Sequence, residues 1–162
     1  MAYFLGIKVG EQIMNYDEKI RELEERIERL ETKILWMAMS KLPNPKHPYY
    51  EWLLYLNIPE NKRELMEHIL VILSWRLENQ AIHEEFKKQI PGIPYELLYS
   101  ESIPSFEEVE EILSIILGFN NRKHIINLLK SLYNEGKFQK LCRYLLEQIG
   151  EDPSEAQLYA PF

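Results

Sequence analysis

Apolar residues recur every seven positions over residues 11–39. Isoleucine fills the first position of each heptad, and tyrosine, leucine or methionine follows three residues later. Neither proline nor glycine interrupts the segment, so the pattern predicts a long α-helix with a narrow, coiled-coil-like apolar stripe. The predicted oligomerisation residues, at heptad positions a and d, are Ile13, Tyr16, Ile20, Leu23, Ile27, Leu30, Ile34 and Met37.

Charged residues beside this stripe favour parallel pairing between copies of the chain. Basic residues occupy g positions and acidic residues occupy e positions; they are Lys19, Arg26 and Lys33, and Asp17, Glu24 and Glu31. A parallel pair sets each g residue beside the next e residue of its neighbour, whereas an antiparallel pair sets like charges together. Isoleucine at a with leucine at d favours two strands, and Tyr16 leaves a trimer open. We therefore expect a parallel homodimer or trimer; the alternative is a helix that packs on its own domain.

Beyond this helix, the pattern predicts an all-α fold. Three prolines in KLPNPKHP, residues 41–48, mark a linker between an N-terminal oligomerisation helix (1–40) and a compact multi-helix bundle (49–150) that ends in a helical hairpin. Residues 151–162 are expected to form a tail. Within the bundle we expect helices over 48–56, 59–79, 105–118, 121–134 and 137–149, and irregular structure over 90–105. Residues 82–89 are expected to form a further short helix or a continuation of the helix before them. Ser105 and Glu108 form a capping-box signature.

The chain has 162 residues, one cysteine and a formal net charge of −7. A single cysteine excludes an intramolecular disulfide and fits a reducing compartment. Its neighbours Leu141 and Leu145 favour a packed thiol for Cys142 over a catalytic one. The sequence shows neither a run of about twenty apolar residues nor a convincing signal peptide, so we expect a cytoplasmic protein without a membrane span.

Basic residues gather near the C-terminus, in contrast to the overall charge. The candidate anion-binding residues are Arg122, Lys123, Lys130, Lys137, Lys140 and Arg143. They predict a site for a small anionic, nucleotide-like ligand, either on the hairpin or at a subunit interface. The alternative is a solvated basic face, or one paired with the acidic run Glu107–Glu111. The basic residues of this region also fit a DNA-binding helix-turn-helix, but the negative net charge argues against nucleic acid as a partner.

The sequence contains no recognisable catalytic, nucleotide or metal-binding motif. Glu64 and His68 share a helical face and His83 precedes two glutamates, but neither has a zinc-site spacing. Aromatic residues such as Trp52 and Trp75 are expected in the core. We therefore expect no catalytic residues, no metal and no cofactor.

Three segments occur in an order that resembles the YhaI-type family of small uncharacterised Bacillus proteins. They are RIERLE at 26–31, PYYEWLL at 48–54 and LLKSLYNEGKFQKLCRYLLEQI at 128–149. Relative to that pattern, residues before Asp17 and residues 81–105 are additions. The resemblance implies an all-α fold with an N-terminal helix, and it implies no activity or site residues.

Together these patterns predict a non-enzymatic interaction or regulatory protein. We expect it to bind itself through the N-terminal helix and, when assembled, to present several copies of the bundle to another protein. A small-ligand binder is the first alternative, and an enzyme is the second.

Overall fold

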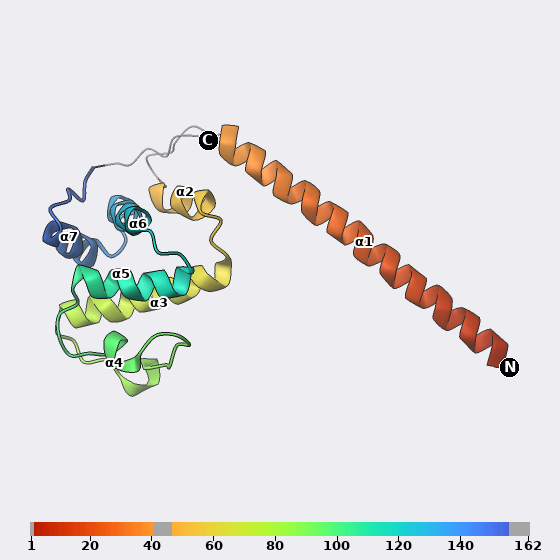
Figure 1. The fold of residues 1–162 in the computed structure, drawn as a ribbon, viewed down its shortest axis with the longest axis horizontal. Coiled ribbons are helices and arrows are strands. Elements are labelled where there is room, and N and C mark those ends of the chain that lie inside the picture. The colour runs from red at the N-terminus through yellow and green to blue at the C-terminus, as the bar shows by residue number, and fades with distance from the viewer. Residues whose placement is uncertain (1, 41–46, 156–162) are drawn as a thin grey trace. The chain divides into compact units, whose positions relative to one another are not determined.

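All regular secondary structure in the described part of the chain is helical (Figure 1). The structure, a computed structural model, describes residues 2–40 and 47–155, with side chains described at 15–35, 37 and 47–155. These ranges hold seven α-helices and one 3-10 turn, and they contain no strand. The prediction of an all-α fold, with a long N-terminal helix followed by a multi-helix bundle, is confirmed. The first helix and the bundle belong to separate compact units and are described separately.

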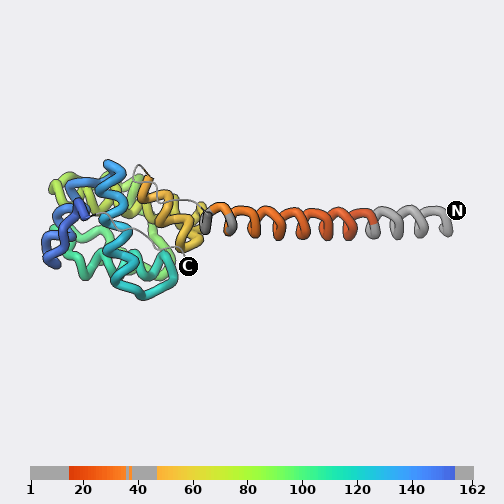
Figure 2. The backbone as a smooth tube through the Cα atoms, turned by 90° about the horizontal axis from the view of Figure 1, so that it is seen from above, coloured from red at the N-terminus to blue at the C-terminus, as the bar shows by residue number. Residues whose placement is uncertain are grey.

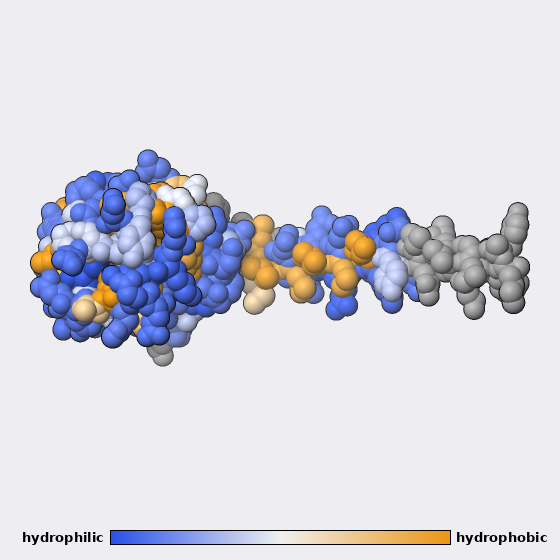
Figure 3. Space-filling model, turned by 90° about the horizontal axis from the view of Figure 1, so that it is seen from below, coloured by the Kyte–Doolittle hydropathy of each residue, from blue (hydrophilic) through white to orange (hydrophobic). Residues whose placement is uncertain are grey.

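Helix α1 runs without interruption from Ala2 to Ser40. The heptad positions that lie in its described part face solvent, with exposed fractions between 53% and 68%. Figure 2 shows the helix as a single straight element, and Figure 3 shows apolar side chains (orange) in a row along one side of it. The side chain of Ile13 lies outside the described residues. The predicted stripe therefore exists as an exposed surface from Tyr16 to Met37.

The bundle in residues 47–155 contains the other six α-helices. They are α2 (Pro48–Tyr55), α3 (Glu60–Leu77), α4 (Tyr95–Leu98), α5 (Phe106–Leu117), α6 (Arg122–Glu135) and α7 (Gln139–Gln148). Helix α6 packs against α2, α5 and α7, while α3 lies beside α5 and also contacts α4 and α7 (Figure 1). The core contains large side chains from each of these helices, among them Trp52, Ile69, Leu98, Phe106, Leu128 and Leu145.

Local signals in the sequence account for the ends of α5 and α6. The Ser105 side chain accepts a hydrogen bond from the Glu108 backbone N–H at 3.2 Å, and Asn121 caps α6 in the same way through His124 N–H. Gly118 and Gly136 end these helices with positive φ angles of 75° and 83°, a conformation that costs glycine little. The capping box is only half formed, because the Glu108 carboxylate binds Arg76 instead of returning to the cap.

Two predicted elements differ from the structure. The expected helix over 82–89 is reduced to a 3-10 turn at Glu84–Phe86. The Tyr99 hydroxyl donates to Lys88 O at 2.6 Å and lies 3.4 Å from Phe86 O, so it occupies carbonyls that a longer helix would use. Within the segment expected to be irregular, α4 forms one turn, which Pro94 precedes.

Helix α7 begins at Gln139, two residues later than predicted. Phe138 adopts a left-handed conformation with φ of 51°, and together with Gly136 it makes the tight turn from α6 into α7. The proline-rich linker prediction falls largely on residues 41–46, which lie outside the described residues. Of the predicted tail, residues 151–155 are described, and Glu151 N–H donates to Leu146 O at the end of α7.

None of the described helices is both long enough and apolar enough to cross a bilayer.

Candidate functional site

The exposed stripe on α1 is the largest set of solvent-facing apolar side chains in the described part of the chain. Its described members are seven residues, each more than half exposed: Tyr16, Ile20, Leu23, Ile27, Leu30, Ile34 and Met37. Leu35, at position b, adds a further exposed apolar side chain near the end of the helix. Six further large apolar residues are at least 38% exposed in the bundle, and they are spread over α2, α4, α5 and the connecting loops. In the described part of the chain, a continuous exposed apolar face is found on α1 alone.

The side of α1 opposite the stripe is polar, and two of its side chains donate hydrogen bonds to the backbone of the same helix. Arg29 Nε donates to Glu25 O at 3.4 Å, and Thr32 Oγ1 donates to Glu28 O at 2.9 Å. A hollow on this helix is lined by Glu25, Glu28, Arg29, Thr32 and Lys33. These residues follow one another along the polar face, so the hollow is a gap between solvated side chains and not an enclosed ligand pocket.

The six basic residues of the predicted anion site lie in different environments. Arg122 packs over the Phe106 ring at 4.7 Å from its centroid and lies 3.6 Å from the Glu110 carboxylate. Lys130 is buried, with a 2% exposed side chain, and its ammonium lies 2.8 Å from Glu151 and 3.5 Å from Glu155. Acids of the same bundle therefore already neutralise these two cations.

Three more of the six also have partners within the bundle. Lys137 Nζ lies 5.3 Å from the ring centroids of both Tyr49 and Tyr50. Lys140 is 3.3 Å from the Glu78 carboxylate.

Arg143 also has a partner within the bundle. Its guanidinium donates to the Tyr133 hydroxyl at 2.7 Å, and this hydrogen bond raises the pKa of the guanidinium. Among the six, Lys123 is the exposed residue without such a contact. The sequence groups these residues, but the structure shows five of them engaged with separate groups. The acidic pairing considered from the sequence applies to Arg122 with Glu110.

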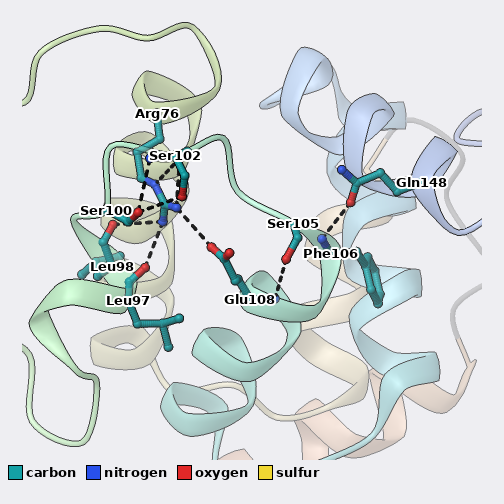
Figure 4. A network of polar contacts seen from close by, with 9 residues as sticks. All are labelled: Arg76, Leu97, Leu98, Ser100, Ser102, Ser105, Phe106, Glu108 and Gln148. Atoms are coloured by element: carbon teal, nitrogen blue, oxygen red, sulfur yellow. Dashed lines mark hydrogen bonds and ion pairs between the residues drawn. The ribbon is translucent and has the colours of Figure 1, made fainter.

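Arg76 forms the densest polar network in the described part of the bundle, and no sequence motif predicts it (Figure 4). Its buried guanidinium donates to the carbonyls of Leu97, Leu98 and Ser102 and to the Glu108 carboxylate, at 3.0–3.2 Å. A single side chain of α3 thereby ties residues 97–102 to the start of α5. Because its donors are all directed at the protein, this arginine is placed for structure and not for binding a ligand.

Glu135 at the end of α6 stabilises the start of α2. Its side chain is only 7% exposed; one oxygen accepts from Tyr49 N–H at 2.9 Å and the other lies 3.0 Å from His47 Nδ1. A carboxylate at a helix N-terminus satisfies a free N–H and interacts favourably with the helix dipole. No local motif reveals this contact, since Glu135 and Tyr49 are far apart in the sequence.

Two buried side chains with hydroxyl or thiol groups are unreactive. Burial raises the pKa of the Cys142 thiol far above its ordinary value, so the thiol stays protonated at neutral pH, as expected for a packed cysteine. Burial and the neighbouring Glu67 carboxylate raise the pKa of the Tyr49 hydroxyl, which donates to Glu67 at 3.0 Å. Both groups are held in their neutral forms.

The described residues contain no group of three or more His, Cys, Asp or Glu side chains that could hold a metal ion. His68 and His124 each have one ring nitrogen that is buried without a hydrogen-bond partner, and the two residues belong to different helices. Neither of these nitrogens is hydrogen-bonded to the Cys142 thiol, which is buried in α7.

Comparison with known proteins found no match. Neither a family model, nor a curated protein, nor a solved structure matches this chain. The resemblance to the YhaI-type family therefore stays a prediction.

Proposed function

We propose that this protein is a non-enzymatic interaction or regulatory protein that assembles into a homo-oligomer through α1. The single observation that supports this best is the exposed apolar stripe from Tyr16 to Met37. Burying one such leucine or isoleucine side chain contributes about 1.5–3 kcal/mol, so an open stripe of seven favours association strongly. An isolated helix gains little from propensity alone and depends on packing of its apolar face.

Self-assembly gives this protein its proposed role, which is to present several identical bundles to a partner. Two linked bundles bind a partner with two sites more tightly than one bundle does, without any new contact. We also propose a cytoplasmic location, because the one cysteine, Cys142, is a free and buried thiol that fits a reducing compartment. Membership of the YhaI-type family is proposed on the segments described above.

Solution mass tests this proposal. Light scattering after size exclusion should give a dimer or trimer for the full chain and a monomer for a truncated chain that starts at Leu42. A monomeric full chain at all concentrations would contradict the proposal. If both chains assemble equally, the interface lies in the bundle and the role of α1 is refuted.

The ligand-binding alternative is less favoured, because five of the six basic side chains have partners within the bundle. A thermal-shift measurement with a panel of nucleotides discriminates the two functions. We expect no shift in melting temperature. A shift that disappears in the double variant Lys137→Glu, Lys140→Glu would instead support a ligand site at the hairpin.

A further inference from the structure

We infer that the stripe on α1 is covered by the same helix of a second copy, in a parallel, in-register and two-stranded coiled coil. This inference rests on the proposed self-assembly and adds the partner's identity, orientation, register and number. It is carried by the charged residues on both sides of the stripe, together with the exposure of the stripe itself.

The flanking charges are unengaged in the described part of α1. Lys19 and Arg26, at g, and Glu24 and Glu31, at e, face solvent and form no ion pair there. The intrahelical contacts of α1 instead join residues of the polar face, such as Arg29 and Glu25. The charges beside the stripe are therefore available to another chain, and their signs decide which orientation that chain can take.

The signs of these charges select one orientation. In a parallel pair, Lys19 of one copy lies beside Glu24 of the other, and Arg26 lies beside Glu31, twice over by symmetry. In an antiparallel pair, g faces g and e faces e, so basic residues meet basic residues and acids meet acids. The helix is thus complementary to itself in the parallel orientation and repels itself in the antiparallel one.

Register and strand number follow from the same stripe. A slip by one heptad leaves one a residue and one d residue of each helix uncovered at the ends, so the aligned pair buries the most apolar surface. Three a positions in the described part carry isoleucine, and Leu23 and Leu30 occupy the central d positions. β-branched residues at a with leucine at d favour two strands.

Cysteine cross-linking tests the orientation. Tyr16 lies near one end of the described stripe, so in a parallel pair Tyr16→Cys places two thiols opposite each other. In the antiparallel pair that centres the stripe, residue 16 faces residue 34, which separates the two thiols by about 27 Å at the rise of an α-helix. We expect most of the full-length variant to run as a covalent dimer after mild oxidation, and the wild type to remain uncross-linked because Cys142 is buried.

Charge reversal tests the same inference without a disulfide. Lys19→Glu with Arg26→Glu should weaken self-association of the full chain about a hundredfold, since four attractive contacts become repulsive. Adding Glu24→Lys and Glu31→Lys should restore association to near the wild-type level. The matched control, Arg21→Glu with Arg29→Glu, makes the same charge change on the polar face and should leave association nearly unchanged.

The outcomes separate this inference from the proposed function. A wild type that assembles, but neither cross-links at position 16 nor weakens on charge reversal, refutes the parallel pair and leaves self-assembly standing. A mass of three or more chains refutes the two-stranded coil. A monomeric wild type refutes both.

Discussion

The bundle and α1 contain similar apolar and charged residues, but the two regions place them in opposite environments. In the bundle, leucines and isoleucines such as Ile69, Leu70 and Leu73 are completely buried, and the buried cations Arg76 and Lys130 have acidic partners. In α1, Ile20 and Ile27 are each 53% exposed, and the charges beside them form no ion pair among the described residues. The bundle therefore buries its large apolar side chains and pairs its buried cations, whereas the apolar stripe of α1 stays exposed in the described part of the chain.

This difference in burial and pairing is what supports the proposal that α1 associates with a second chain. An apolar stripe alone also occurs on a helix that packs in its own domain. An exposed stripe bordered by acids on one side and bases on the other is typical of a coiled-coil surface. Substitutions in the stripe should change self-association, and substitutions in the bundle should change its free energy of unfolding, each without affecting the other region.

The largest effect is expected from a charge in the centre of the stripe. Ile27→Asp buries a carboxylate in the proposed seam, which is costly without a partner, so the full chain should become monomeric and lose helix content. Light scattering and far-ultraviolet circular dichroism measure both. Thr32→Asp on the polar face is the matched control and should keep the wild-type mass. If Ile27→Asp still assembles, α1 does not form the interface.

The next largest effect is expected at Arg76, within the bundle. Arg76→Met removes the donors for three backbone carbonyls and leaves the Glu108 carboxylate without its partner, so the free energy of unfolding should fall by about 3 kcal/mol or more. Chemical denaturation of the full chain measures this loss. Arg63→Met, which removes a more exposed arginine from Glu60 and Glu67 on the same helix, is the control and should have a much smaller effect. Equal losses would show that the buried network adds little.

A smaller loss of stability is expected at Lys130, and its size should depend on which partner of the ion pair is replaced. Glu151→Gln with Glu155→Gln leaves a buried ammonium without an anion, and we expect the free energy of unfolding to fall by about 2 kcal/mol. Lys130→Met removes the charge and returns two partly exposed carboxylates to water, so its cost should be below about 1 kcal/mol. Denaturation curves for the two variants compare these costs directly. The reverse order would mean that the ion pair itself stabilises the bundle.

Much of the fold could be predicted because its signals are local. The heptads define α1, Ser105 and Asn121 start α5 and α6, and Gly118 and Gly136 end them. These features act within one or two helical turns, so a single sequence reveals them. The exposed stripe of the candidate site was predictable for the same reason.

The missed features depend on contacts between distant residues. The expected helix over 82–89 is not formed, because the Tyr99 hydroxyl hydrogen-bonds to a backbone carbonyl oxygen of that segment. In the sequence, Arg76 looks like an ordinary charged residue of α3, and only its contacts with residues 97–102 distinguish it. Similarly, the basic residues form one cluster in the sequence, yet Lys130 lies inside the bundle and Lys123 outside it. Helical periodicity predicts which residues form an element, but it does not predict which distant groups meet.

The smallest effect is expected at Glu135, a contact of this long-range kind. Glu135→Gln keeps the size of the side chain and can still accept from Tyr49 N–H, but it removes the negative charge at the start of α2 and beside His47. The free energy of unfolding should fall by about 0.5–1 kcal/mol, the usual contribution of a charge at a helix end. Glu147→Gln, on the exposed side of α7, is the control and should leave stability unchanged. Because the bundle is stabilised from within, this loss should leave the oligomeric mass of the full chain as it is; a variant that also dissociates would show that the two regions are not independent.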